Sequence, residues 1–95
     1  MSVDKAASTD VVDIEAEVRA VLRDVLALDA ATADGMTTDT PLFGALPELD
    51  SMAVAGLLTE LEDRLDILID DDEVDGELFE TFGALTAFIR AKVAA

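Results

Sequence analysis

One serine stands where a side chain could carry covalent chemistry. Ser51 lies in the stretch ELDSMAV, residues 48–54, directly after Asp50 and directly before an apolar helical pattern. A serine hydroxyl is a weak nucleophile unless an adjacent base removes its proton. The sequence has no histidine and no cysteine, and Lys5 and Lys92 lie near its two ends. We therefore expect no catalytic residue and no enzymatic activity.

The position of Ser51 suits a different chemistry. Aspartate and serine are both common N-cap residues, so Asp50 or Ser51 begins the helix. If Asp50 is the cap, the Ser51 hydroxyl faces solvent in the first turn. Free backbone N–H groups and the positive end of the helix dipole favour a phosphate ester there. The hydroxyl then suits attachment of a phosphorylated group by another enzyme, and the simpler alternative is that Ser51 only caps the helix.

The composition excludes several classes of ligand. The 95 residues include 22 acidic and 6 basic side chains, which gives a net charge of -16. Such a charge repels nucleic acids and anionic membranes, attracts basic protein surfaces or cations, and opposes self-association. We therefore expect a monomer that binds neither nucleic acid nor membrane.

Acidic side chains concentrate around and after the serine. Residues 48–75 contain eleven acids and one base, Arg64. The two alternatives are a solvated face and a surface that steers a basic partner. We expect partner docking at Val54, beside the serine, and at three acids further along the helix: Glu60, Glu62 and Asp63.

The acidic run DDEVDG resembles part of a calcium-binding loop but does not complete it. With Asp71 as the first position, Glu73, Asp75 and Gly76 match the third, fifth and sixth positions. The twelfth position, which requires a bidentate glutamate, is Phe82. We therefore expect no specific metal site.

Chain length and the N-terminal residues indicate one soluble domain. We expect a flexible tail over residues 1–9 and a single domain over residues 10–95. The segment MSVDKAASTD is neither a secretory signal nor a transit peptide, and no run approaches the roughly 18 apolar residues of a membrane span. These features favour a cytoplasmic protein.

Apolar spacing predicts an all-α four-helix bundle with three longer helices, one short helix and a long first loop. The first helix follows an N-cap at Asp10 and reaches Leu28, and a loop of about twenty residues leads to the second helix. Residues 66–70 form an extended link, residues 71–75 a helical turn, and Thr81 caps the last helix. The expected core includes Met52, Leu58, Leu61, Ile69, Phe79, Phe88 and Ile89.

The triplet Asp50-Ser51-Met52 resembles the Asp-Ser-Leu motif of acyl carrier proteins. The likeness runs from about Val11 to Val93 and includes the loop end D-T-P-L-F-G and the acidic segment LEDRLDILIDDDEV. It implies that Ser51 carries 4'-phosphopantetheine from coenzyme A, flanked by Asp50 and Met52 and installed by a phosphopantetheinyl transferase. The thiol of that group would hold acyl cargo as a thioester, which agrees with a chain that has no cysteine.

A narrower likeness concerns the carriers encoded with exosortase-type exopolysaccharide systems. PELDSMAV and the segment that begins LEDRLDILIDDDEVDG are similar to those carriers. The resemblance implies loading by an acyl-activating ligase or acyltransferase with a basic docking surface. Ala53, Val54 and Gly56 stand where fatty-acid carriers often have acids, which favours specialised metabolism over general elongation.

Two rival functions need no covalent modification. One is an acidic helical module that binds a basic protein through its surface alone. The other is a small calcium sensor, which the missing twelfth ligand disfavours. Phosphopantetheinylation of Ser51 would separate the carrier from both.

Overall fold

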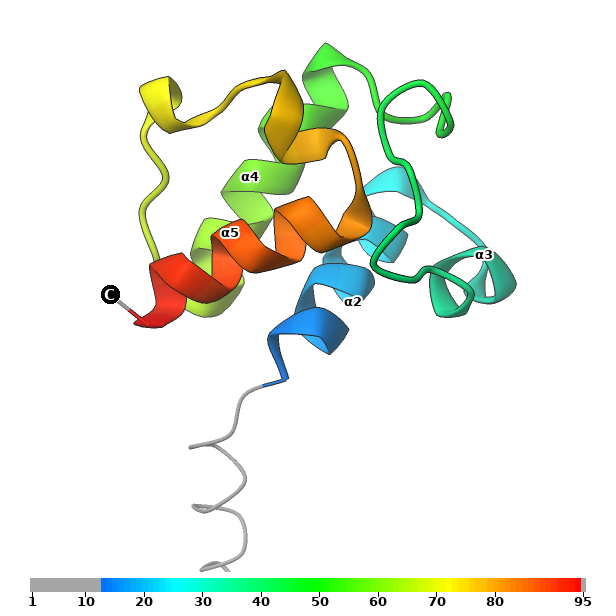
Figure 1. The fold of residues 1–95 in the computed structure, drawn as a ribbon, viewed down its shortest axis with the longest axis horizontal. Coiled ribbons are helices and arrows are strands. Elements are labelled where there is room, and N and C mark those ends of the chain that lie inside the picture. The colour runs from blue at the N-terminus through cyan, green and yellow to red at the C-terminus, as the bar shows by residue number, and fades with distance from the viewer. Residues whose placement is uncertain (1–12, 95) are drawn as a thin grey trace, which may run out of the picture.

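Three long helices form the body of the protein in a computed structural model that describes residues 13–94 (Figure 1). They are α2 (Ile14–Leu26), α4 (Ser51–Leu65) and α5 (Phe82–Ala94). A shorter helix, α3 (Ala30–Asp34), follows α2, and two 3-10 helices, η1 (Asp71–Glu73) and η2 (Gly76–Phe79), precede α5. Residues 13–94 contain no β-strand, so the predicted all-α fold is confirmed.

Aspartate side chains cap the first two helices. Asp13 caps α2 by accepting a hydrogen bond from the Ala16 N–H at 3.1 Å. The predicted cap at Asp10 and the predicted tail over residues 1–9 lie outside the described residues. Asp29 caps α3 and accepts from the Thr32 N–H at 2.8 Å. Because α3 lies where we predicted continuous loop, that part of the prediction was wrong.

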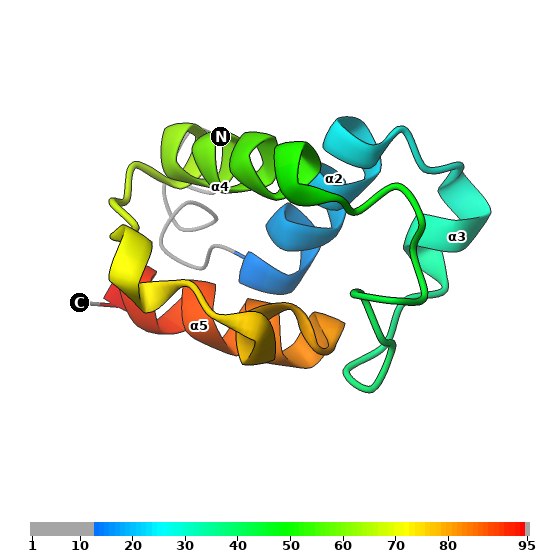
Figure 2. The same cartoon turned by 90° about the horizontal axis from the view of Figure 1, so that it is seen from above.

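The core lies where the three long helices meet. In Figure 2, α2 lies between α4 and α5, and α2 packs against both. The fully buried side chains are aliphatic with two phenylalanines. They are Val18, Val21, Leu22, Leu42, Leu57, Leu61, Phe79, Phe82, Leu85 and Ile89.

The face of α4 that is buried differs from the face predicted from the sequence. Met52 is 85% exposed, so its assignment to the core was wrong, whereas Leu57 is fully buried beside Leu61. Leu58 is half-buried against the core. Residues three apart and residues four apart both lie on one side of a helix, and packing against α2 selects the face centred on Leu57 and Leu61.

Core assignments outside α4 were mostly correct. Phe79 and Ile89 are buried as predicted. Ile69 and Phe88 are half-buried and pack against the core cluster from its edge.

The long loop before α4 is fastened to the segment that joins η2 and α5. Four backbone N–H groups donate across this contact: Leu42 to Glu80, Phe43 to Phe79, Phe82 to Thr40 and Gly83 to Thr38, at 2.8–3.2 Å. The side chain of Leu42 is fully buried, while Phe43 is 44% exposed. Residues 38–43 of the loop are therefore fixed to this segment by backbone hydrogen bonds.

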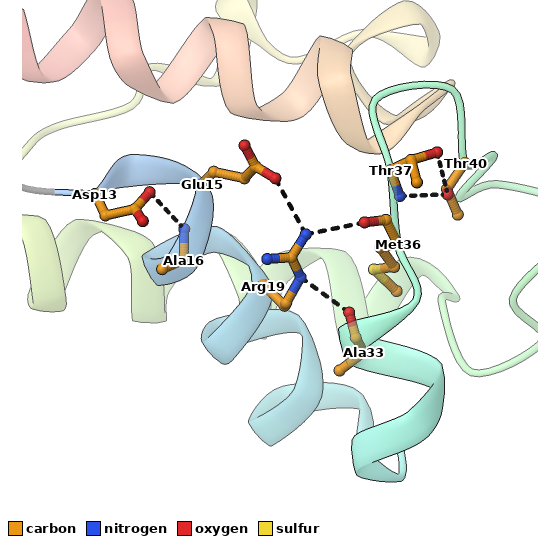
Figure 3. A network of polar contacts seen from close by, with 8 residues as sticks. All are labelled: Asp13, Glu15, Ala16, Arg19, Ala33, Met36, Thr37 and Thr40. Atoms are coloured by element: carbon orange, nitrogen blue, oxygen red, sulfur yellow. Dashed lines mark hydrogen bonds and ion pairs between the residues drawn. The ribbon is translucent and has the colours of Figure 1, made fainter.

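Arg19 ties α2 to the loop region (Figure 3). Its Nε donates to the carbonyl oxygen of Ala33 at 2.9 Å, and its Nη2 donates to that of Met36 at 2.9 Å. Nη2 also pairs with Glu15 at 3.1 Å, and the guanidinium lies 5.1 Å from the centroid of the Phe82 ring. These contacts hold the end of α3 against α2, where Ala33 and Met36 are buried.

The segment from α4 to α5 follows the prediction in part. Residues 67–70 form a non-helical link, and the predicted single turn is η1. The second 3-10 helix, η2, was not predicted. Thr81 caps α5, because its Oγ1 accepts from the Ala84 N–H at 3.0 Å. Within residues 13–94, no helix is both long enough and apolar enough to cross a bilayer.

Candidate functional site

Ser51 is the first residue of α4, and its side chain is exposed to solvent. Asp50 is the N-cap: its Oδ1 accepts a hydrogen bond from the Ala53 N–H at 2.9 Å, and its carbonyl oxygen accepts from the Val54 N–H at 2.9 Å. The Ser51 hydroxyl is therefore not used to cap the helix. It stands free at the helix start, as expected if Asp50 is the cap.

The start of α4 is favourable for an anionic group. The first N–H groups of a helix have no intrahelical partner. Asp50 takes those of Ala53 and Val54, which leaves the N–H groups of Ser51 and Met52 without a backbone partner within residues 13–94. No acidic side chain lies in the first turn of α4. A phosphate ester on Ser51 would meet the positive end of the helix dipole and two N–H donors.

The loop before α4 places this helix start by three apolar anchors. Leu42 and Leu49 are buried, and Leu46 is half-buried against the core. The Leu46 N–H donates to the Leu42 carbonyl at 3.0 Å, and the Leu49 N–H donates to the Leu46 carbonyl at 3.0 Å. We did not predict a role for Leu49, although its position three residues after the apolar Leu46 and two before Ser51 was a usable signal.

The apolar neighbours of Ser51 differ in exposure. Met52, which follows the serine, is 85% exposed. Val54 is half-buried and packs against the core cluster. The Met52 side chain is therefore open to solvent at this end of α4, whereas only part of the Val54 side chain is exposed.

The three predicted docking acids have different surroundings. Glu60 pairs with Arg64 at 2.7 Å, and Glu62 accepts a hydrogen bond from the Ile69 N–H at 2.7 Å. Asp63 is exposed and makes no ion pair or side-chain hydrogen bond within residues 13–94. Two of the three carboxylates therefore already have a partner inside the molecule, and Asp63 does not.

Arg64 links the acidic side of α4 to α2. Its Nη2 pairs with Asp24 at 2.8 Å while its Nε pairs with Glu60. The hydrogen bond from Arg64 holds the pKa of the Asp24 carboxyl below its ordinary value, with a smaller contribution from Arg23. The one basic residue of segment 48–75 is thus engaged in ion pairs inside the molecule.

One cavity in the described part of the chain lies away from Ser51. It has a volume of about 240 Å³ and lies between the first turns of α2, the loop at Thr38 and one face of α5. Thr86 lines it, and the Thr86 hydroxyl is buried without a hydrogen-bond partner within residues 13–94. None of the predicted site residues lines this cavity. Residues 13–94 also hold no cluster of acids, histidines or cysteines that could bind a metal ion.

The Ser51 hydroxyl is exposed and makes no hydrogen bond to a base within residues 13–94. The chain has no histidine, and Arg64, the basic residue nearest to Ser51 in sequence, is paired with Glu60 and Asp24. A serine hydroxyl without an adjacent base is a weak nucleophile.

Comparison with known proteins agrees with this geometry. The family described as "Phosphopantetheine attachment site" matches residues 16–89. Among solved structures, the chain is similar to a holo acyl carrier protein from Nitrosomonas europaea determined by solution NMR. The sequences are 43% identical over 86% of this chain and 96% of that one, with a TM-score of 0.78. Among curated proteins, none matches the chain.

Proposed function

Because the chain belongs to the phosphopantetheine attachment-site family, we propose that it is an acyl carrier protein with 4'-phosphopantetheine attached to Ser51. The observation that carries this proposal is the exposed Ser51 hydroxyl at a helix start whose capping is done by Asp50. When bound, the group supplies a thiol on which acyl cargo is held as a thioester. The chain has no cysteine of its own to do this.

The residues around Ser51 fit a phosphodiester. The N–H groups of Ser51 and Met52 are not used by Asp50, and no acidic residue follows the capping Asp50 in the first turn of α4. A phosphate at this position would gain the favourable interaction that anions make with a helix N-terminus. The role of the chain in attachment is to present the oxygen and stabilise the product.

Attachment requires a phosphopantetheinyl transferase. The Ser51 oxygen forms a bond to the phosphorus that bears pantetheine in coenzyme A, and the bond from that phosphorus to the adenosine bisphosphate half breaks. The serine proton passes to a base of the transferase, because the chain has no histidine and Ser51 makes no hydrogen bond to a base within residues 13–94. We propose Asp50 and Met52 as the residues that flank the group.

We further propose that the carrier serves specialised metabolism and is loaded by an acyl-activating ligase or an acyltransferase with a basic docking surface. In support, the first two turns of α4 carry Ala53, Val54 and Gly56, and its acids begin only at Glu60. This pattern resembles the carriers of exosortase-associated systems. A partner approaching Ser51 would meet Met52 and Val54 first, and Glu60, Glu62 and Asp63 further along α4.

Intact-mass analysis tests the attachment. Incubation with coenzyme A and a broad-specificity phosphopantetheinyl transferase should add the mass of one phosphopantetheine to the wild type and to Ser8→Ala, and none to Ser51→Ala. Peptide mapping should place the group on residue 51, because the other serines, Ser2 and Ser8, lie in a different peptide. An unchanged wild-type mass would favour an acidic interaction module that needs no modification, for which Ser51→Ala should keep full biological activity.

A further inference from the structure

The cavity at the start of α5 lies outside the proposed attachment site. Its volume is about 240 Å³, and α2, the loop before α4 and α5 bound it. Three of its lining residues, Phe82, Thr86 and Arg90, follow at intervals of four and therefore share one face of α5. Gly83 and Ala87 lie beside them, and neither fills the space with a long side chain. An engineered cavity of about 150 Å³ binds benzene, so this one accepts a small organic molecule.

The Thr86 hydroxyl is a buried polar group that a ligand can satisfy. Thr86 is 5% exposed, and its Oγ1 has no hydrogen-bond partner within residues 13–94. It therefore does not bond back to the Phe82 carbonyl oxygen one turn earlier, as helical threonines often do. Most buried polar side-chain atoms have a partner, and one without it lowers the stability of the fold. A molecule in the cavity that bonds to this hydroxyl removes that penalty.

The charges that line the cavity favour an anion. Arg90 lies one helical turn after Thr86, is exposed, and makes no ion pair with any of residues 13–94. Glu15 is the one acid among the lining residues, and Arg19 holds it at 3.1 Å, as Figure 3 shows, so its charge is offset. The net charge of -16 is spread over the chain, and salt at physiological concentration screens exposed charges beyond about 8 Å. The unpaired charge at the cavity is therefore positive.

We propose that this cavity binds a small organic carboxylate that has a short apolar or aromatic body. The Arg90 guanidinium donates charge-assisted hydrogen bonds to the carboxylate, which are the stronger kind. The Thr86 hydroxyl, one turn earlier on the same face of α5, donates to the same group and so gains the partner it lacks. The apolar body of the ligand occupies the space beside Gly83 and Ala87. A neutral ligand of the same shape loses the interaction with Arg90.

The bound carboxylate joins α5 to the loop that leads to α4. Thr38 lines the cavity from that loop, and its carbonyl oxygen accepts the Gly83 N–H at 2.9 Å. A ligand that binds the folded chain and not the unfolded one stabilises the fold as its concentration rises above the dissociation constant. Ser51 does not line the cavity, so this site does not rest on the proposed carrier function.

Titration with benzoate tests the proposal. The probe is sodium benzoate at constant ionic strength, followed by amide chemical shifts of the full-length ¹⁵N-labelled protein. We expect saturable shifts centred on Thr38 and residues 82–90, and much weaker binding of benzamide, which keeps the ring and lacks the charge. Arg90→Met should bind benzoate about tenfold more weakly and Thr86→Val about fivefold more weakly. These are the sizes expected for loss of a charge-assisted and of an ordinary hydrogen bond.

The matched controls are Arg23→Met and Thr59→Val, which remove the same groups from exposed positions outside the cavity, on α2 and α4. Both should bind benzoate as the wild type does, and so should Ser51→Ala. Without benzoate, Thr86→Val should not unfold at lower urea concentration than the wild type, because the hydroxyl it removes has no partner. A lower unfolding midpoint would overturn the proposal. So would the absence of saturable binding, equal affinity for benzamide, or unchanged benzoate affinity in either Arg90→Met or Thr86→Val.

Discussion

Gly83, at the start of α5, lies directly against Thr38 of the loop that leads to Ser51. The Gly83 N–H donates to the Thr38 carbonyl oxygen at 2.9 Å. A Cβ atom on residue 83 would lie 2.7 Å from that oxygen, 3.2 Å from the Thr38 Cα, and in steric conflict with the Thr38 Cγ2. This contact is one end of the backbone pairing between residues 38–43 and 79–83, so a glycine here lets the loop approach α5.

Gly83→Ala should lower the stability of the fold. The added methyl group meets backbone atoms, which cannot rotate away, and overpacking of this kind costs about 1–3 kcal/mol. Urea unfolding followed by circular dichroism should show a lower midpoint with little change in slope. A wild-type midpoint would mean that the loop shifts freely and is not fastened as the structure indicates.

Gly56→Ala should have the opposite effect. Gly56 lies inside α4, and a Cβ atom there would meet only the Val25 Cγ1, at 3.7 Å, which is ordinary van der Waals contact. Alanine is favoured over glycine in a helix interior by about 1 kcal/mol. The same unfolding assay should show a raised midpoint. A lowered midpoint would mean that α2 and α4 lie too close together at Gly56 to accept a methyl group.

Local sequence signals were sufficient for the features that depend on local chemistry. Thr81 begins α5, and Ser51 stands exposed at the start of α4, because capping is decided within a few residues. The all-α class followed from apolar periodicity. The predictions for Leu61 and Ile89 hold for the same reason.

Features that depend on tertiary contacts were missed. The short helix α3 is stabilised by the Arg19 side chain, which bonds to Ala33 and Met36 from fourteen and seventeen residues away. Met52 was assigned to the core because it continues the i, i+3 spacing from Leu61, but only the Leu61 end of that series is buried. The bond from Ile69 to Glu62 likewise depends on the chain reversing after α4.

Asp50→Ala should destabilise the start of α4. The substitution removes the acceptor of the Ala53 N–H, and loss of an N-cap costs about 1 kcal/mol. Asp50→Asn keeps an oxygen acceptor and should stay near the wild-type thermal midpoint. Asp63→Ala is the charge control, because Asp63 makes no side-chain contact with another charged or polar group within residues 13–94. Equal midpoints for Asp50→Ala and Asp63→Ala would show that the cap does not hold this helix start.

The ion pair between Glu73 and Lys92 should make stability depend on acid pH. The Lys92 Nζ donates to both Glu73 carboxylate oxygens, at 2.8 and 3.0 Å, and fastens η1 to α5. The hydrogen bond from Lys92, then that from the Asp70 N–H, holds the pKa of Glu73 below its ordinary value of 4.5. A carboxyl with a lowered folded-state pKa stabilises the fold fully above its unfolded pKa, and this contribution is lost as pH falls through the folded value. Lys92→Met should therefore unfold at lower urea concentration than the wild type at pH 7, and the difference should shrink below about pH 4.5.

Arg90→Met is the matched control for that pH series. It removes a positive charge from α5, where Arg90 makes no ion pair with any of residues 13–94. At pH 7 the unfolding midpoint of Arg90→Met should differ from that of the wild type by less than the midpoint of Lys92→Met does. This difference should not change as Glu73 titrates. Glu73→Gln should reproduce the loss seen in Lys92→Met, since either change removes the pair. If the difference in unfolding midpoint between wild type and Lys92→Met stays constant from pH 7 to pH 3, Lys92 stabilises the fold through its ammonium group over the Phe88 ring rather than through the Glu73 carboxylate.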